Sequence, residues 1–315
     1  MRVSILIKAY NHEPFIARAI ESVLAQETDV AYEIVVGEDC STDRTRDVLR
    51  DVRDRHPERI RVLLRERNLG NIRNFTDTLS ACTGEYVALL DGDDYWTSAH
   101  KLQRQVAFLD AHPEFSSCAC NAAVVDASGE TVIGTYCPDE RSQAIPLRRM
   151  LISDPVPTST VMFRRRLIGE FPAWYSTIMM GDWPLLVLLL QHGDLWYEAQ
   201  IAAVHRVHAG GLWSGAEPAR RRLARIEIYE HLNAELGFAH DGLVRERIAR
   251  QYLALADQAQ QAGHWLRADK YVRRALRVCR WNRRVLLRRS FLKLLPGLLK
   301  QRVQGSRVSG SGPPQ

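Results

Sequence analysis

The sequence predicts an α/β fold in which a Rossmann-like mixed sheet is flanked by helices and followed by an all-helical C-terminal extension. Three observations support this prediction. The first hundred residues alternate short β-branched runs with segments of helical periodicity, which is typical of βαβ units. The run Tyr86–Leu90 is continuously apolar, as in a strand buried on both faces. From Ala219 to Cys279 the pattern is helical, and a chain of 315 residues with 46% hydrophobic content can bury a large core.

The N-terminal elements alternate between strand and helix. The expected strands are Val3–Ala9, Tyr32–Val36, Ile60–Leu64 and Tyr86–Leu90, and the expected helices are His12–Gln26, Asp43–His56 and Asn71–Cys82. The first helix carries its apolar residues on one face and should pack across the first strand. Ser41 and Thr42 are expected to cap the second helix. The fourth strand stops abruptly at the sequence DGDD, as expected where a buried parallel strand reaches the ligand-binding edge of a sheet.

Beyond Trp96 the sheet is expected to become mixed, because a hairpin pattern appears around the turn sequence DASG. The expected elements are a helix at His100–His112, hairpin strands at Phe115–Val125 and Thr131–Tyr136, a strand at Thr158–Phe163, a helix at Pro184–His192 and a strand at Leu195–Val207. A glycine-rich stretch, AGGLWSG, follows the last strand. The catalytic domain is therefore predicted to span residues 1–215.

The C-terminal third is predicted to form a helical extension over residues 216–283 and a basic amphipathic tail over residues 284–315. The segment YLALADQAQQAGHWLRADKYVRRAL resembles one tetratricopeptide-like helix pair, but such arrays normally need about three repeats, which favours a plain helical extension. The tail interleaves leucine with arginine and lysine. It could lie on an anionic membrane surface or form an exposed basic helix, and its last residues, GSGPPQ, should be disordered.

Composition excludes several classes of protein. No stretch approaches the roughly 18 apolar residues of a membrane span, and the N-terminus lacks the pattern of a secretory signal. A cytoplasmic location is therefore expected. If the basic tail binds lipid, the protein would be attached peripherally to the inner face of the cytoplasmic membrane. The six cysteines form no CxxC pair, which indicates neither a zinc site nor a disulfide framework. The net charge of +6 comes without a nucleic-acid reader motif, so nucleic acid is not an expected partner.

Two acidic clusters follow neighbouring expected strands. Asp91, Asp93 and Asp94 place like charges at one strand end, which is unfavourable unless a cation neutralises them. Glu38 and Asp39 follow the second strand, so both clusters should meet at one sheet edge. Mg²⁺ or Mn²⁺ accepts one or two carboxylates and leaves its other positions to phosphate and water. The sequence therefore predicts a divalent-metal site that binds a diphosphate.

Several motifs resemble one enzyme family. VSILIKAYNHEPFIARAIESVLAQ, EIVVGEDCSTDRTRDVL, ERNLGN and GEYVALLDGDDYW resemble, in order and spacing, the nucleotide-binding half of family 2 glycosyltransferases. KLQRQVAFLDAHP, MGDWPLLVLLLQHG and HRVHAGGLWSG resemble a bacterial branch associated with surface polysaccharide assembly, so the resemblance covers residues 1–215. It implies a GT-A fold and a metal-dependent, inverting transfer of sugar from a nucleotide-diphosphate donor.

Carried over to this sequence, the resemblance implies which residues bind the nucleotide. Ala9, Tyr10 and Asn11 would line its pocket, and Glu38 and Asp39 would contact the base or ribose. An acidic side chain can accept a hydrogen bond from the imide of uracil or thymine. The family commonly has two aspartates where this chain has a glutamate and an aspartate.

The resemblance also implies the groups that bind the diphosphate and the metal. Asp91, Gly92 and Arg206 would contact the nucleotide-sugar, and Asp91, Asp93 and His208 would hold the metal. His208 precedes Gly210 and Gly211 in a loop that could order over the donor. A lone histidine is more often structural, so metal ligation by His208 and a purely structural role both stay open.

Asp182 is the candidate general base. Inversion requires a carboxylate that removes the proton of the acceptor hydroxyl. In GDWPL, Asp182 stands just before Pro184, a residue favoured in the first turn of a helix, so its side chain should lie at a helix N-terminus. The alternative is a simple helix cap.

These inferences predict an inverting transferase that moves a sugar from a UDP- or dTDP-sugar to a hydroxyl of a glycan or lipid-linked glycan. One alternative is a catalytically silent nucleotide-sugar-binding scaffold whose helical extension binds partners. A second is a nucleotidyltransferase, although KAYNHEPF lacks the glycine-rich phosphate loop expected there. A dehydrogenase is disfavoured because the first strand-to-helix turn has no G-x-G-x-x-G.

Overall fold

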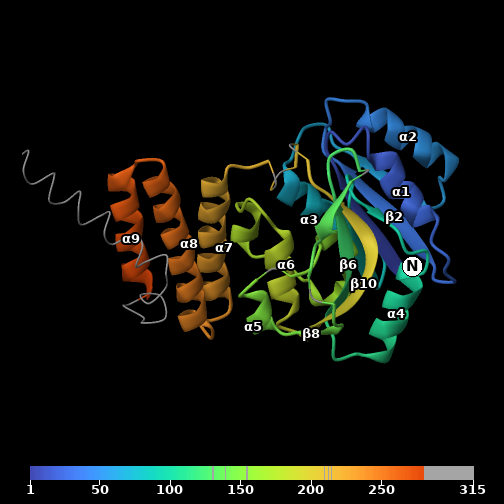
Figure 1. The fold of residues 1–315 in the computed structure, drawn as a ribbon. Helices are drawn as coiled ribbons and strands as arrows, with labels where there is room; N and C mark the ends of the chain where they lie inside the picture. The colour runs from blue at the N-terminus through green and yellow to red at the C-terminus, as the bar shows by residue number, and fades with distance from the viewer. Residues whose placement is uncertain are drawn as a thin grey trace, which may run out of the picture. The chain divides into compact units, whose positions relative to one another are not determined.

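The computed structural model describes residues 1–129, 131–138, 140–153, 155–208, 210–211, 213 and 215–279 (Figure 1). The chain divides into two compact units, Met1–Gly215 and Ala216–Gln315. The basic amphipathic tail predicted for residues 284–315, and the last four residues of the predicted helical extension, lie outside the described residues. Among the residues that are described, no helix combines the length and the apolar character needed to span a membrane.

The first unit is built on one mixed sheet. Its strands are β1 (Val3–Ala9), β2 (Tyr32–Glu38), β3 (Ile60–Leu64), β4 (Tyr86–Asp91), β5 (Tyr95–Trp96), β6 (Ser117–Val125), β7 (Val132–Thr135), β8 (Gln143–Ile145), β9 (Met162–Arg164) and β10 (Leu195–Arg206). The main path runs β3-β2-β1-β4-β9-β6-β10-β5, with β7 beside β6 and β8 beside β10. Strands β3, β2, β1 and β4 are parallel, and β9 lies antiparallel to β4 and β6. The predicted mixed α/β fold is confirmed.

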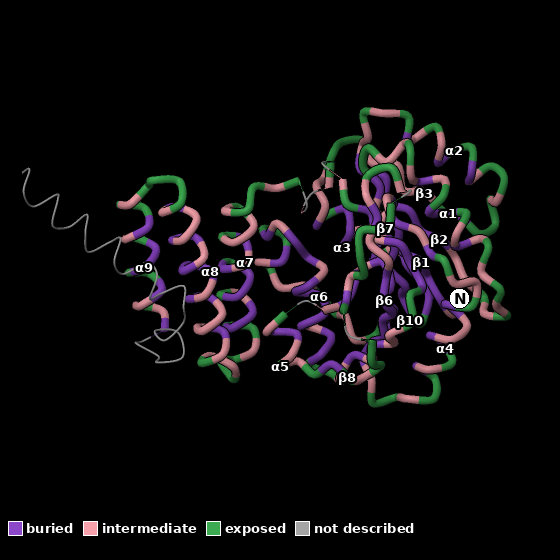
Figure 2. Tube along the Cα trace, in the orientation of Figure 1, coloured by how far each residue is buried: buried purple, intermediate pink, exposed green. Residues whose placement is uncertain are grey.

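Helices cover both faces of the parallel half of the sheet. They are α1 (Ile16–Leu24), α2 (Thr45–Arg55), α3 (Asn71–Ala81), α4 (Lys101–Ala111), α5 (Leu147–Met150) and α6 (Asp182–Leu189). Alternate residues of β1 pack with α1, α2 and α4 in one core, whereas α3 packs on the opposite face, where Asn74 donates to the main-chain oxygen of Gly37 at 2.7 Å. Burial on both faces leaves the central strands almost wholly inaccessible (Figure 2).

Several predictions of where elements begin and end were wrong. The first helix begins at Ile16 and not at His12, because Asn11 has a positive φ of 55° and the following residues form a turn. Ser41 and Thr42 do not cap α2, which begins at Thr45. The expected strand at Thr158–Phe163 divides into a 3-10 turn (Thr158–Thr160) and β9, because the amide of Thr160 bonds back to the carbonyl of Pro157 at 3.0 Å.

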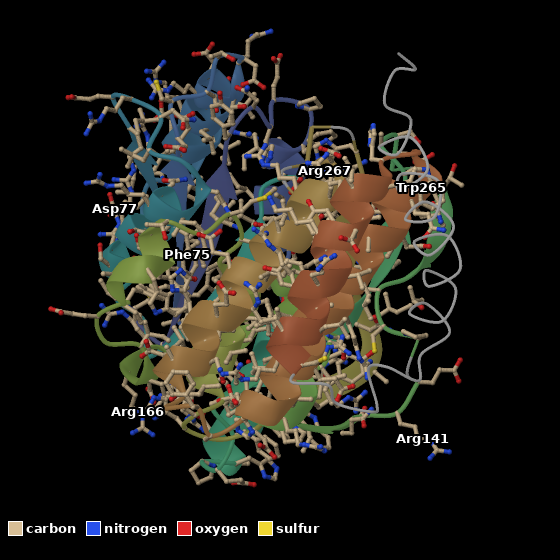
Figure 3. The ribbon with its side chains drawn as sticks, turned by 90° about the vertical axis from the view of Figure 1, so that its left-hand side faces the viewer. Phe75, Asp77, Arg141, Arg166, Trp265 and Arg267 are labelled. Atoms are coloured by element: carbon tan, nitrogen blue, oxygen red, sulfur yellow. The ribbon has the colours of Figure 1, made fainter. Side chains whose placement is uncertain are left out.

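The second unit contains three helices in its described part, α7 (Pro218–Glu235), α8 (Asp241–Gln261) and α9 (Trp265–Cys279). Pro218 starts α7, where its missing N–H costs no hydrogen bond. Gly263, with a φ of 77°, ends α8, and the two bonds that close this helix are Gly263 N to Gln260 O and His264 N to Ala259 O. Trp265 lies at the start of α9 (Figure 3).

Candidate active site

The carboxyl ends of β1, β2 and β4 meet at one edge of the sheet. Ala9 on β1 lies opposite Glu38 on β2, and Lys8 on β1 lies opposite Asp91 on β4. The parallel register therefore gathers the loops that follow these three strands, and these loops carry most of the residues predicted for the site.

The loop after β1 is fixed against the loop after β2. The amide of Asn11 donates to the hydroxyl of Ser41 at 2.9 Å, and the side-chain oxygen of Asn11 accepts from the amide of Thr42 at 2.8 Å. Ala9 is buried, whereas 43% of Tyr10 is exposed, an unusual position for a large aromatic side chain. Asn11 thus acts as a clamp between the loops and leaves the ring of Tyr10 accessible at the sheet edge.

Glu38 is wholly buried, and both of its carboxylate oxygens are already bonded within the protein. Arg46 donates to Oε2 at 2.6 Å, and the amides of Ser41 and Cys40 donate to Oε1 and Oε2 at 2.6 and 3.3 Å. Glu38 therefore shapes the loop after β2. Its predicted contact with a base or ribose stays a prediction.

Asp39 is also buried and organises the next loop. Its Oδ1 accepts from the amide of Leu69 at 2.7 Å and its Oδ2 from the amide of Gly70 at 2.9 Å, while its main-chain oxygen accepts from the Asn68 side chain at 3.0 Å. The ERNLGN motif is thus folded around this carboxylate. The predicted role of Asp39 in nucleotide binding stays a prediction too.

Asp91, at the end of β4, pairs with a lysine that the sequence reasoning missed. Lys8 Nζ lies 2.9 Å from Asp91 Oδ1 and 3.3 Å from Asn71 Oδ1. Burial lowers the pKa of Lys8, but the charges of Asp91 and then Asp182 outweigh burial and raise that pKa above its ordinary value. A signal was available, because a lysine within the apolar strand VSILIKA requires a partner.

Asp93 lies between two imidazoles. Its Oδ2 is 2.9 Å from His208 Nε2 and 3.9 Å from His12 Nε2. Burial raises the pKa of Asp93, but the hydrogen bond from His208 and the charge of His12 outweigh it and lower that pKa to about 2. The same hydrogen bond raises the pKa of His208. The structure therefore brings together the predicted pair Asp93 and His208, and adds His12, which was not foreseen.

The donor set at Asp93 fits a metal that is shared with a substrate. Within the described residues, no three histidine, cysteine or acidic side chains come close enough to enclose a metal ion. A carboxylate oxygen and an imidazole nitrogen suit Mn²⁺ or Mg²⁺ when the remaining positions belong to phosphate and water. Asp91 is held by Lys8, so its predicted part in metal binding stays a prediction.

Asp94 is buried and connects two parts of the site. Its Oδ1 accepts from the amide of Arg206 at 2.8 Å, and its Oδ2 contacts His205 Nδ1 at 3.2 Å and accepts from the hydroxyl of Ser159. Burial raises the pKa of Asp94. The carboxylate of Asp94 is thus bonded both to the end of β10, which leads to His208, and to the 3-10 turn Thr158–Thr160.

The guanidinium of Arg206 supports the turns around Asp93. Its Nε donates to the main-chain oxygen of Asp93 at 3.2 Å and its Nη1 to that of Ala127 at 3.1 Å, and its plane lies 4.7 Å from the ring centre of Phe15. Gly92 needs its lack of a side chain, because a Cβ there would lie 2.7 Å from the main-chain oxygen of Lys8. The predicted contacts of Arg206 and Gly92 with the donor stay predictions.

Asp182 is the first residue of α6, so it is not the residue that precedes the helix and caps it, which is Gly181. Its Oδ2 accepts from the hydroxyl of Thr158 at 2.9 Å, and its Oδ1 accepts from the amide of Trp183 at 2.9 Å. Thr158 is followed by Ser159, whose hydroxyl accepts from the amide of Asp91 at 3.4 Å, so Asp182 lies in the same part of the site as Asp91. Its predicted role as a base stays a prediction, but its position is compatible with that role.

This fold and this acidic sheet edge define a glycosyltransferase of the GT-A class. The chain belongs to the family described as Glycosyl transferase family 2, whose model matches residues 4–168. It is 33% identical to the uncharacterized protein Rv1520 of Mycobacterium tuberculosis, over 80% of this chain and 73% of that protein. It is 35% identical to the UDP-Glc:alpha-D-GlcNAc-diphosphoundecaprenol beta-1,3-glucosyltransferase WfaP of Escherichia coli, over 36% of this chain and 44% of WfaP.

A solved structure shares the fold. TarS of S. aureus, residues 1–349 in complex with UDP-GlcNAc, superposes with a TM-score of 0.64 at 19% sequence identity, over 97% of this chain and 92% of that chain. The predicted GT-A fold and the predicted glycosyltransferase family are therefore confirmed.

Proposed function

We propose that this enzyme transfers a sugar, with inversion, from a UDP- or dTDP-sugar to a hydroxyl of a glycan or lipid-linked glycan, with the help of a divalent metal, in the synthesis of a cell-surface polysaccharide. The observation that carries the proposal is the acidic sheet edge itself. Asp91 and Asp93 lie in the turn after β4, and the amide of Asp91 donates to Ser159, whose neighbour Thr158 is bonded to Asp182. WfaP, a UDP-Glc:alpha-D-GlcNAc-diphosphoundecaprenol beta-1,3-glucosyltransferase, and the TarS complex with UDP-GlcNAc support this donor and acceptor class.

Asp93 and His208 would hold the metal, since they present one oxygen and one nitrogen donor side by side. When bound, a divalent metal stabilises the charge of a departing diphosphate. Asp91 was predicted to share this task, and its second carboxylate oxygen would serve it while Lys8 keeps the first. Tyr10 is exposed where a nucleobase could stack on it.

Asp182 would accept the proton of the acceptor hydroxyl. The acceptor oxygen attacks the anomeric carbon, the bond from that carbon to the diphosphate breaks, and the proton moves to the carboxylate. The hydroxyl of Thr158 orients the carboxylate of Asp182, and Ser159, the next residue, is bonded to Asp94. Hydrogen bonds thus link Asp182, through the Thr158–Thr160 turn and Asp94, to Arg206 at the end of β10, two residues before His208.

Donor binding tests the first part of the proposal. The enzyme would be titrated calorimetrically with UDP, dTDP, GDP, ADP and CMP, first with Mn²⁺ and then with a chelator. We expect binding of UDP or dTDP that is lost with the chelator. Failure to bind any of these nucleotides would contradict the proposed donor class.

Asp182→Asn tests the second part. Asparagine keeps an oxygen for Thr158, so the variant should fold and bind donor, while transfer should fall by about 10² to 10⁴-fold because the base is gone. Asp77→Asn, on α3 (Figure 3), removes a carboxylate from the same unit and should transfer normally. Wild-type turnover by Asp182→Asn would contradict the assignment of the base.

A further inference from the structure

Lys8 is the one charged residue in the strand VSILIKA, and its burial is greater than that of an ordinary surface lysine. The side chain of Lys8 is 23% exposed, and its ammonium group contacts Asp91 at 2.9 Å and Asn71 at 3.3 Å. Withdrawing an ammonium group from water is unfavourable unless partners replace the water. Within the part of the chain that the structure describes, these two contacts engage two of the three N–H donors of the ammonium group, and the third can serve another acceptor.

The surroundings of Lys8 contain more negative charge than one ion pair requires. Asp91, Asp182 and Asp93 all raise its pKa. Asp93 follows Asp91 in the same turn, and the amide of Asp91 donates at 3.4 Å to the hydroxyl of Ser159, whose neighbour Thr158 is bonded to Asp182. The other partner of the Lys8 ammonium group is the side-chain oxygen of Asn71, the first residue of α3. Lys8 therefore lies beside Asp91, at a space bordered by the turn that carries Asp93 and by the Thr158–Thr160 turn that holds Asp182.

That space is where the transferred sugar would be held, an argument that rests on the proposed function. The diphosphate would be bound at Asp93 and His208, and the acceptor hydroxyl would approach Asp182, so the sugar ring must lie between them. Ring hydroxyls both donate and accept hydrogen bonds. Lys8 and Asp91, held 2.9 Å apart, supply one donor and one acceptor side by side.

We propose that Lys8 is a donor-sugar binding residue, which together with Asp91 hydrogen-bonds hydroxyls of the transferred sugar and contributes little to binding of the nucleotide. The nucleotide would instead be held by the loops after β1 and β2, where the ring of Tyr10 is exposed. Lys8 would thus help to decide which sugar is accepted.

The test distinguishes the effect of Lys8 on binding of the sugar from its effect on binding of the nucleotide. Wild type, Lys8→Met and Lys8→Arg would be titrated calorimetrically in Mn²⁺ with UDP, UDP-glucose, UDP-galactose and UDP-GlcNAc, and with dTDP and dTDP-glucose. Arg2→Met is the matched control, because Arg2 precedes the same strand at its other end and also pairs with carboxylates, those of Glu85 and Asp110.

We expect Lys8→Met to bind the free nucleotide within about twofold of wild type and to bind the preferred nucleotide-sugar about 10-fold or more weakly, since hydrogen bonds from charged groups are of that strength. Lys8→Arg keeps the ion pair with Asp91 but is larger, so it should show a smaller loss for the sugar and none for the nucleotide. Arg2→Met should change neither.

Other outcomes would overturn the inference. An equal loss of UDP and UDP-sugar affinity would assign Lys8 to the diphosphate, and unchanged affinities would make it a purely structural ion pair. If Lys8→Met does not fold, Lys8→Arg decides alone, because equal effects on nucleotide and nucleotide-sugar would refute the sugar contact. A wild-type enzyme that binds none of these ligands would contradict the proposed function and not the placement of Lys8.

Discussion

Replacement of Arg46 by methionine tests how the buried carboxylate of Glu38 is stabilised. Glu38 is 0% exposed, and the guanidinium of Arg46 is its only side-chain partner among the hydrogen bonds found in the described residues, at 2.6 Å. Arg46→Met keeps most of the aliphatic length but leaves the carboxylate with two main-chain amides, those of Cys40 and Ser41. The variant therefore isolates the charge partner.

The size of the effect follows from this geometry. Removal of one partner of a buried ion pair costs about 3 to 5 kcal/mol, and the two remaining amides together with the 27% exposure of the Arg46 side chain place this case near 3 kcal/mol. For a unit of this size, each kcal/mol lowers Tm by about 2 to 4 °C, so Tm should fall by about 6 to 12 °C. UDP binding should weaken as well, because Glu38 holds the loop that fixes Asn11.

Thermal unfolding followed by circular dichroism measures this change. Arg53→Met is the control on the same helix, since its pair with Asp54 is exposed and should contribute at most about 1 kcal/mol. The double variant Glu38→Gln with Arg46→Met should recover part of the loss, because a neutral amide needs no counter-charge. A Tm for Arg46→Met equal to that of Arg53→Met would refute the reasoning.

Two further predictions concern the metal-binding turn. Gly92→Ala should lower the free energy of unfolding, measured in urea, by about 1 to 3 kcal/mol, because its Cβ would lie 2.7 Å from the main-chain oxygen of Lys8. The control Gly134→Ala should be nearly neutral, since a Cβ at that position meets no atom within 4 Å. In chelator, His208 should stabilise the protein fully below pH 6.5, its ordinary pKa, and lose this effect as pH rises through its raised pKa. The Tm difference between wild type and His208→Gln should therefore shrink from pH 6 to alkaline pH. Asp93, whose pKa is lowered to about 2, stays charged over this range and loses its stabilising effect only in acid. A constant difference would contradict the pair.

Much of the fold was predictable because the relevant patterns are local. The apolar strand before DGDD identified β4, and alternation of strand and helix identified a parallel sheet whose carboxyl edge gathers Glu38 and Asp91. The start of α1 was less predictable, since it depends on a turn that begins at Asn11. That turn exists because main-chain amides there bond to Ser41, in the loop after β2, and to Thr45, the first residue of α2.

The sequence by itself determined that the acidic residues after β2 and β4 meet at one sheet edge, because parallel strands bring their carboxyl ends together whatever their side chains do. Only the tertiary structure decided what each charged group contacts. It placed Arg46 on Glu38, Lys8 on Asp91 and His208 on Asp93, partners that lie 8, 83 and 115 residues apart along the chain. A carboxylate withdrawn from water takes the nearest available donor in space, and sequence spacing does not specify that distance.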